Sequence, residues 1–142
     1  MLLKNASILY GNELTFVTSI NLKISEKIFK KIKPNLSSSR KEEVIDCEGL
    51  LVIPGFVNSH THIGDSIGKD IGLKQDVEAK IHPIYGLKSK LLKKSNPAHL
   101  ANFMKNTCHS MISKGITTFV DFREGGLEGV ILLKQEIGRA HV

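Results

Sequence analysis

The stretch that decides the fold is Val52-Ile53-Pro54-Gly55-Phe56-Val57-Asn58-Ser59-His60-Thr61-His62-Ile63-Gly64-Asp65. It predicts a buried β-strand, Val52 to Ile63, that carries two histidines at its end. Successive side chains of a strand point to opposite faces, so His60 and His62 share a face. Zinc accepts histidine nitrogen and usually has three or four ligands, so this pair would supply half of a metal site. Because His-x-His also occurs by chance on polar surfaces, the spacing alone leaves both interpretations open.

The residues before the histidines favour the metal interpretation. An apolar run leads through Pro54-Gly55 and Phe56-Val57 to Asn58 and the two histidines. This segment resembles the first barrel strand of the amidohydrolase superfamily, whose signature is Pro-Gly-hydrophobic-(hydrophobic)-Asn/Asp-x-His-x-His. The cytosine-deaminase- or chlorohydrolase-like branch is the most similar. A second, independent match is Gly115-Ile116-Thr117-Thr118-Phe119-Val120-Asp121, which resembles the second strand of the same family.

The resemblance implies a metal-dependent hydrolase of non-peptide C–N bonds, of the deaminase or cyclic-amide type. It makes His60 and His62 ligands of a divalent metal, with zinc expected first and iron or manganese as alternatives. The metal would activate a water molecule, and the substrate would be a small heterocycle or cyclic amide. No residue of this sequence is assigned a catalytic role, and Asp65, His82, Asp121 and Arg123 are left without one.

The sequence predicts an α/β fold with two parts. Residues 1–54 contain strand-like alternation, a polar loop near residues 34–41 and a further strand at Val44–Gly49. They predict a small antiparallel unit, which the resemblance makes part of an N-terminal β-sandwich. Residues 55–142 would form the first βα units of a (β/α)₈ barrel.

Within the second part, Asn96 to Lys114 carries the strongest helix pattern, with a capping asparagine, proline at the first position and Gly115 at the end. A strand to Phe122 follows, so strand, helix and strand predict a parallel βαβ unit. The glycine-rich stretch of residues 64–86 predicts a long loop rather than a helix. Arg123 is expected to pair with Glu124 or Asp121.

Composition excludes several classes of protein. The chain has 142 residues, of which 41% are hydrophobic, and no apolar run approaches the roughly 20 residues of a membrane-spanning helix. No signal-peptide pattern opens the sequence, and Cys47 and Cys108 show no motif spacing. We therefore expect reduced thiols, a cytoplasmic location and no membrane partner.

The net charge of +6 raises the alternative of a basic nucleic-acid-binding module. Lysines cluster at residues 27–33 and 88–94, but they alternate with apolar residues, as solvated faces of ordinary elements do. No nucleic-acid-binding motif accompanies them, so no such partner is predicted.

A complete barrel needs about 250 residues. In the resembled family the other metal ligands and the catalytic aspartate lie on later strands. We therefore expect this sequence to be an N-terminal fragment that is inactive and prone to aggregate. A non-catalytic metal-binding or scaffold protein with vestigial histidines is the alternative.

Overall fold

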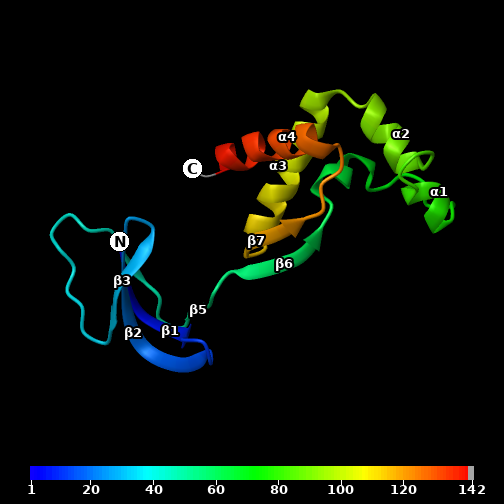
Figure 1. Ribbon diagram of the computed structural model, residues 1–142. Helices are drawn as coiled ribbons and strands as arrows, with labels where there is room; N and C mark the ends of the chain where they lie inside the picture. Colours follow the sequence, from blue (N-terminus) through cyan, green and yellow to red (C-terminus); the bar gives the residue numbers. More distant parts are fainter. Residues whose placement is uncertain (141–142) are drawn as a thin grey trace. The chain divides into compact units, whose positions relative to one another are not determined.

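The computed structural model describes residues 1–140, with side chains described as far as residue 137. The chain divides into two compact units, one covering Met1–Pro54 and the other beginning at Gly55 (Figure 1). The first is built of strands, and the second combines two strands with helices. The α/β class predicted from the sequence is therefore confirmed, while the complete barrel and sandwich stay predictions.

The first unit is a single mixed sheet of five strands. The strands are β1 (Leu2–Tyr10), β2 (Thr15–Ser25), β3 (Ile28–Lys33), β4 (Val44–Asp46) and β5 (Leu51–Val52). Their spatial order is β3-β2-β1-β4, and β5 also pairs with β1. Neighbours β1 and β2 are antiparallel, as are β2 and β3, whereas β4 and β5 run parallel to β1. The prediction of an antiparallel unit is therefore wrong for its last two strands.

A buried asparagine interrupts the alternation of β2. Asn21 is only 8% exposed. Its side-chain oxygen accepts a hydrogen bond from the backbone N–H of Asn5 at 3.0 Å, and its amide donates to the carbonyl of Pro34 at 2.8 Å. Asn5 has a positive φ of 58°, and the β1–β2 register shifts beside it. Because these bonds satisfy a buried polar side chain, Asn21 can lie between two buried apolar neighbours.

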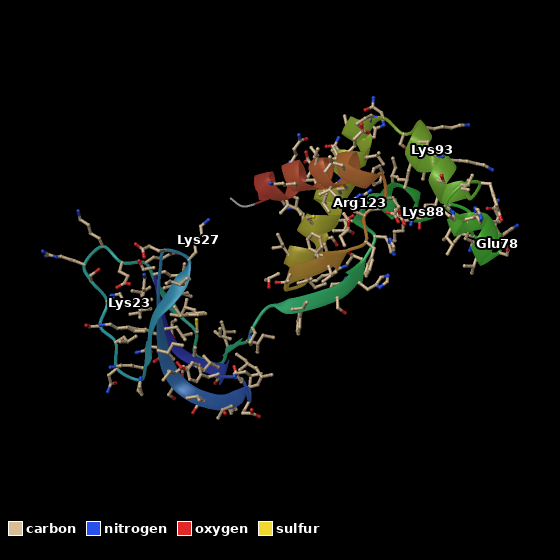
Figure 2. All side chains as sticks on the ribbon, viewed as in Figure 1. Lys23, Lys27, Glu78, Lys88, Lys93 and Arg123 are labelled. Carbon is tan, nitrogen blue, oxygen red and sulfur yellow. The ribbon has the colours of Figure 1, made fainter. Side chains whose placement is uncertain are left out.

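The core of the first unit lies on one side of this sheet. Lysines such as Lys23 and Lys27 extend from the strands and turns around it (Figure 2). Cys47 and Cys108 are both free and buried. The buried members of the first core are Ala6, Ile8, Ile20, Leu22 and Cys47.

The second unit begins with β6 (Phe56–Thr61), which pairs in parallel with β7 (Ile116–Asp121). The predicted parallel pairing is confirmed, but the predicted continuous strand from Val52 to Ile63 is wrong. Val52 belongs to β5 of the other unit, and no strand is formed at Ile53–Gly55. Pro54 cannot donate a ladder hydrogen bond, which explains the break. The strand is also not buried, since Val57 is 63% exposed.

Helix α3 (Pro97–Ser113) connects the two parallel strands and begins and ends as predicted. The side chain of Asn96 accepts a hydrogen bond from the N–H of Ala98 at 2.8 Å, and Gly115 has a φ of +78° beyond the helix end. Helix α3 packs with α4 (Gly126–Ala140) around the second core, whose buried members are Ile63, Met104, Cys108, Met111 and Leu133.

No helix in residues 1–140 is long and apolar enough to cross a membrane.

The glycine-rich stretch after β6 is not the helix-free loop that we expected. It contains the 3₁₀ helix η1 (Ile63–Gly68) and the helix α1 (Val77–Ile81), and helix α2 (Leu87–Lys94) follows it directly. Gly72, with a φ of +69°, and Gly86 lie between these helices, whereas Gly64 and Gly68 lie inside η1. The glycines therefore do not prevent short helices from forming.

Candidate metal site

The two histidines lie where β6 ends. His60 is the penultimate residue of the strand, and His62 follows its last residue and precedes η1. The backbone N–H of Phe122 donates to the carbonyl of Thr61 at 2.8 Å and so holds this end of the strand against the end of β7. The Nε2 atoms of His60 and His62 are 3.2 Å apart. The ring nitrogens therefore converge, as their shared face predicted.

An aromatic ring lies beside both imidazoles. The centroid of the Phe122 ring is 4.4 Å from that of His60 and 5.8 Å from that of His62. Both histidines remain exposed, and Phe122 itself is 50% exposed. One side of the histidine pair is thus restricted by Phe122 while the pair remains open to solvent.

Asp121 fixes the backbone around the histidines. Its Oδ1 accepts hydrogen bonds from the N–H of Ile63 at 2.7 Å and from the hydroxyl of Thr61 at 3.0 Å. These bonds tie the residues on either side of His62 to the end of β7. Asp121 itself contacts neither imidazole in any described interaction of residues 1–137, so it supports the strand end rather than the ring nitrogens.

Arg123 is buried against Asp121, which confirms one of the two partners expected for it. The two side chains are 8% and 5% exposed, and Nη1 of Arg123 is 3.7 Å from Oδ2 of Asp121. Gly64 makes room for this arginine, because a Cβ atom there would overlap its guanidinium. Gly129 makes room for the backbone carbonyl of Glu124, which a Cβ atom at position 129 would overlap. Arg123 is therefore part of the packing between β7, η1 and α4.

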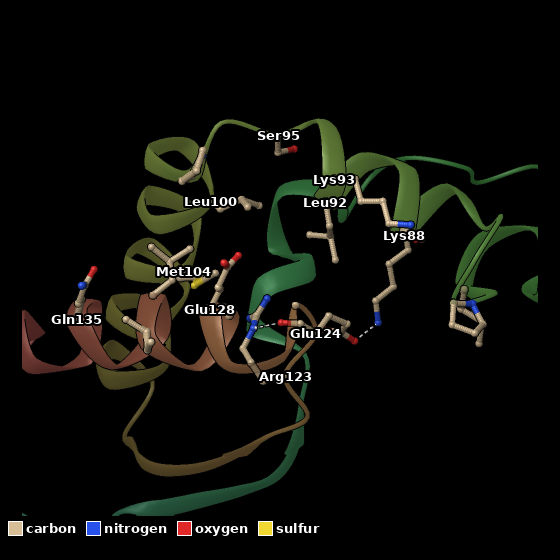
Figure 3. Close-up of a pocket in the computed structure, with 18 residues that line it drawn as sticks. Lys88, Leu92, Lys93, Ser95, Leu100, Met104, Arg123, Glu124, Glu128 and Gln135 are labelled. Carbon is tan, nitrogen blue, oxygen red and sulfur yellow. Dashed lines mark hydrogen bonds and ion pairs between the residues drawn. The ribbon is translucent and has the colours of Figure 1, made fainter.

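Glu124 connects His62 to a lysine that sequence reasoning missed. Its Oε1 is 3.0 Å from Nδ1 of His62 and also accepts a hydrogen bond from the ammonium of Lys88. Lys88 extends from α2 toward Glu124 (Figure 3). Its Nζ also lies 2.7 Å from Oδ2 of Asp65. We call Lys88, Asp65 and Glu124 the charged triad. The sequence predicts that Lys88, like its neighbours at residues 88–94, lies on a solvated face. In the structure its side chain is only 21% exposed.

The charged triad shifts the pKa of each member. Burial alone would raise the pKa of Glu124, but the hydrogen bond and the charge of Lys88 outweigh it and lower that pKa. Burial would lower the pKa of Lys88, but Asp65 and Glu124 outweigh it and raise that pKa. For Asp65, burial raises the pKa, with repulsion from Glu124 adding to it and Lys88 opposing it. The triad therefore favours a charged Lys88 and an ionised Glu124.

Two sets of ligand atoms near His62 could hold a cation. One is the pair of Nε2 atoms. The other consists of one ligand atom each from His62, Asp65 and Glu124, all within 4.8 Å of one another. In the second set, the ammonium of Lys88 already lies between the two carboxylates. Lys88 therefore already supplies the positive charge that these oxygens attract. The pair of Nε2 atoms is the better candidate for the metal site.

A cavity of about 900 Å³ lies away from the histidines. It is bounded by α2, α3 and α4, where Lys88, Arg123 and Glu124 line it (Figure 3). Neither His60 nor His62 is among its lining residues. Its contact with the site is limited to these three side chains, and we assign it no substrate.

The other histidines that the structure describes lie outside the site. Nδ1 of His82 accepts a hydrogen bond from the N–H of Ile84 at 3.2 Å, and the ring stacks on Tyr85 with centroids 3.4 Å apart. His99 and His109 are exposed on α3, as expected.

Comparison with known proteins identifies the family. The model of the amidohydrolase family matches residues 51–142, which include both histidines and both parallel strands. This chain belongs to the amidohydrolase family. Solved structures of the family share its fold. The chain superimposes with a TM-score of 0.73 on the zinc complex of atrazine chlorohydrolase TrzN from Arthrobacter aurescens, at 16% identity, over 97% of this chain and 33% of that one.

Relatives in sequence carry aminohydrolase and deaminase names. A Methanothermobacter thermautotrophicus protein with an aminohydrolase name is 43% identical over 138 residues, which are 97% of this chain and 35% of that protein. The 5-methylthioadenosine/S-adenosylhomocysteine deaminase of Pyrococcus furiosus is 31% identical over 127 residues, or 85% of this chain and 28% of that enzyme. This amidohydrolase chain therefore spans about a third of the length of these relatives.

Proposed function

We propose that this chain forms the first part of a metal-dependent hydrolase of non-peptide C–N bonds, in which Nε2 of His60 and Nε2 of His62 bind one divalent metal ion. The single observation that carries the proposal is the separation of 3.2 Å between these two atoms. Zinc–nitrogen bonds of 2.0–2.1 Å at a tetrahedral angle place two ligand nitrogens about 3.3–3.4 Å apart. The separation of the two Nε2 atoms in the chain therefore fits such an ion.

Zinc is the first choice because imidazole suits it, and iron and manganese are alternatives. When bound, the ion would supply a water molecule of lowered pKa and would polarise the bond under attack. The chain's own residues have separate tasks. His60 and His62 hold the ion, Asp121 holds the strand end by its bonds to Thr61 and Ile63, and Phe122 restricts one side of the imidazole pair.

The substrate class is proposed from the relatives. One is named a 5-methylthioadenosine/S-adenosylhomocysteine deaminase and another, from Methanothrix thermoacetophila, a 5'-deoxyadenosine deaminase. These names support a small heterocycle that carries an amino group, with a cyclic amide as the alternative. We further propose that β6, α3 and β7 are the first elements of a (β/α)₈ barrel and that the strands of residues 1–54 are part of a β-sandwich. The parallel β6–β7 pair and its connecting helix support the barrel.

Metal binding to variants of the chain tests this proposal. Two ligands bind zinc weakly, so we expect substoichiometric metal that a chelator removes easily. Replacing His60→Ala and His62→Ala together should abolish this binding, as followed by cobalt absorption or zinc competition. His99→Ala with His109→Ala is the matched control, because it removes two exposed histidines of α3. Equal binding by the two double variants would contradict the proposed site.

A further inference from the structure

The two ring nitrogens of His62 face different partners. Nε2 faces Nε2 of His60 at 3.2 Å, and Nδ1 faces Oε1 of Glu124 at 3.0 Å. An ionised carboxylate can only accept hydrogen bonds, so in neutral His62 the hydrogen must lie on Nδ1. The lone pair is then on Nε2, on the side where His60 also presents its Nε2.

The opposite tautomer would prevent shared metal binding. A hydrogen on Nε2 of His62 would occupy the position that a metal ion needs, and Nδ1 would present a lone pair to the negative carboxylate of Glu124. The hydrogen bond made by one ring nitrogen determines which nitrogen is free to bind metal. The contact between Glu124 and Nδ1 therefore decides whether His62 can act together with His60.

Glu124 is held in place at both its side chain and its backbone. Its Oε1 accepts from Lys88, and Lys88 is held in turn by Asp65 at 2.7 Å. Its backbone carbonyl accepts a hydrogen bond from Nε of Arg123 at 3.0 Å. Because His62 is exposed, such anchoring is needed if the carboxylate is to stay on Nδ1 rather than turn to solvent.

We propose that Glu124 is a positioning residue, which fixes the tautomer and ring orientation of His62 so that Nε2 is presented to the metal ion, and that Lys88 holds Glu124 for this task. This inference rests on the proposed function, because it concerns the same histidine pair. Two simpler roles compete with it. Glu124 would stabilise the fold through Lys88 alone, or it would be a metal ligand itself together with Asp65.

Substitutions at Glu124 separate these roles. Glu124→Gln keeps an oxygen that can accept from Nδ1–H, whereas Glu124→Ala removes the acceptor. Glu128→Ala is the matched control, because Glu128 is an exposed glutamate one helical turn further along the chain. Lys88→Met tests the anchor, and Lys93→Met, an exposed lysine of the same helix, is its control.

The first measurement is heteronuclear NMR of the ring nitrogens of His62 in the metal-free chain, at a pH where histidine is neutral. We expect Nδ1–H in the wild type and in Glu124→Gln, and a shift toward Nε2–H in Glu124→Ala. Lys88→Met should give a mixture of the two. The wild-type spectrum suffices even where a variant does not fold, since an Nε2–H wild type would overturn the inference.

The second measurement is zinc affinity by chelator competition. Loss of a carboxylate that orients a ligating histidine typically weakens metal binding by about 10- to 100-fold, which we expect for Glu124→Ala. Glu124→Gln, Glu128→Ala and Lys93→Met should stay close to the wild type. If Glu124 were a ligand, Glu124→Gln would lose as much affinity as Glu124→Ala. If it served only the fold, neither variant would change the tautomer.

Failure of this inference can be told from failure of the proposed function. If His60→Ala with His62→Ala leaves metal binding unchanged, the metal site itself is wrong, whatever tautomer His62 has. If the histidine pair binds metal and Glu124→Ala changes neither tautomer nor affinity, the metal site stands and the positioning role is wrong.

Discussion

The packing of Arg123 against Gly64 allows a sharp test of how the strand end is held. In Gly64→Ala, the new Cβ would overlap the guanidinium of Arg123, so the arginine must move from its place beside Asp121. Gly64 is itself buried, and the side chains of Arg123 and Asp121 are 8% and 5% exposed. Displacement of the arginine therefore leaves a buried carboxylate without its counter-charge.

The size of the effect follows from this geometry. Breaking a buried ion pair costs about 3–5 kcal/mol. The 3.7 Å separation of Nη1 and Oδ2 is too long for a good hydrogen bond, which favours the lower end, about 3 kcal/mol. Alanine also restricts the unfolded chain, which returns about 0.4–1 kcal/mol. We expect Gly64→Ala to lower the free energy of unfolding of the second unit by about 2–3 kcal/mol.

Native-state hydrogen exchange is the appropriate assay, because it measures the protection of each of the two compact units by itself. Peptides from η1, β7 and α4 should lose protection in Gly64→Ala, while peptides from residues 1–54 should not. Gly68→Ala is the control on the same 3₁₀ segment, because its Cβ would meet flexible apolar side chains, the tip of Leu91 at 2.6 Å and Ile71 at 3.3 Å, and no charged group. Moving that tip should cost about 1 kcal/mol or less.

A double-mutant cycle identifies the cause. In a chain that already carries Arg123→Ala, the further change Gly64→Ala should cost almost nothing, because no guanidinium remains to be displaced. An equal cost of Gly64→Ala in both backgrounds would show that displacement of Arg123 is not the cause. A cost in the wild-type background no larger than that of Gly68→Ala would show the same.

Three further predictions concern other parts of the chain. Met104→Ala should destabilise the second unit by about 2–5 kcal/mol, because Met104 is fully buried. Urea unfolding followed by hydrogen exchange measures this loss of stability, and an unchanged stability would contradict the described core. Asn96→Ala should cost about 1 kcal/mol and expose the first turn of α3 to exchange, whereas Asn96→Asp should restore the cap. The pKa of Glu42 is lowered by the Ser39 N–H and by Lys23, against an opposing effect of burial. Its ionised form therefore stabilises the fold above its unfolded pKa, and this stability is lost as the pH falls through the lower folded pKa. Glu42→Gln should flatten the acid side of the stability–pH curve, and an unchanged curve would rule out this contribution.

Elements with strong local signals could be predicted from the sequence. Helix α3 carries its start and stop in Asn96, Pro97 and Gly115. The direction of β4 could not be predicted, because alternation is the same in parallel and antiparallel strands. The short helices α1 and α2 were missed because glycines nearby outweighed a weak periodic pattern.

The site was predictable only in part, for a related reason. His60 and His62 are two residues apart on one strand, so their convergence follows from strand geometry. Lys88 and Glu124 are separated by 36 positions and meet only because η1 and α2 return the chain toward the end of β7. The only signal in the sequence was that Lys88 lies at helical spacing from Leu87, Leu91 and Leu92. This spacing does not indicate which residue Lys88 pairs with.

The most direct test of the metal site is a zinc-edge anomalous map of the chain crystallised with zinc. We expect an anomalous peak about 2.0–2.1 Å from Nε2 of His60 and from Nε2 of His62, with Lys88 still bound to Glu124 and Asp65. A peak at Nδ1 of His62 that is bonded to the carboxylates of Asp65 and Glu124, with Lys88 displaced, would contradict both the metal site and the positioning role of Glu124.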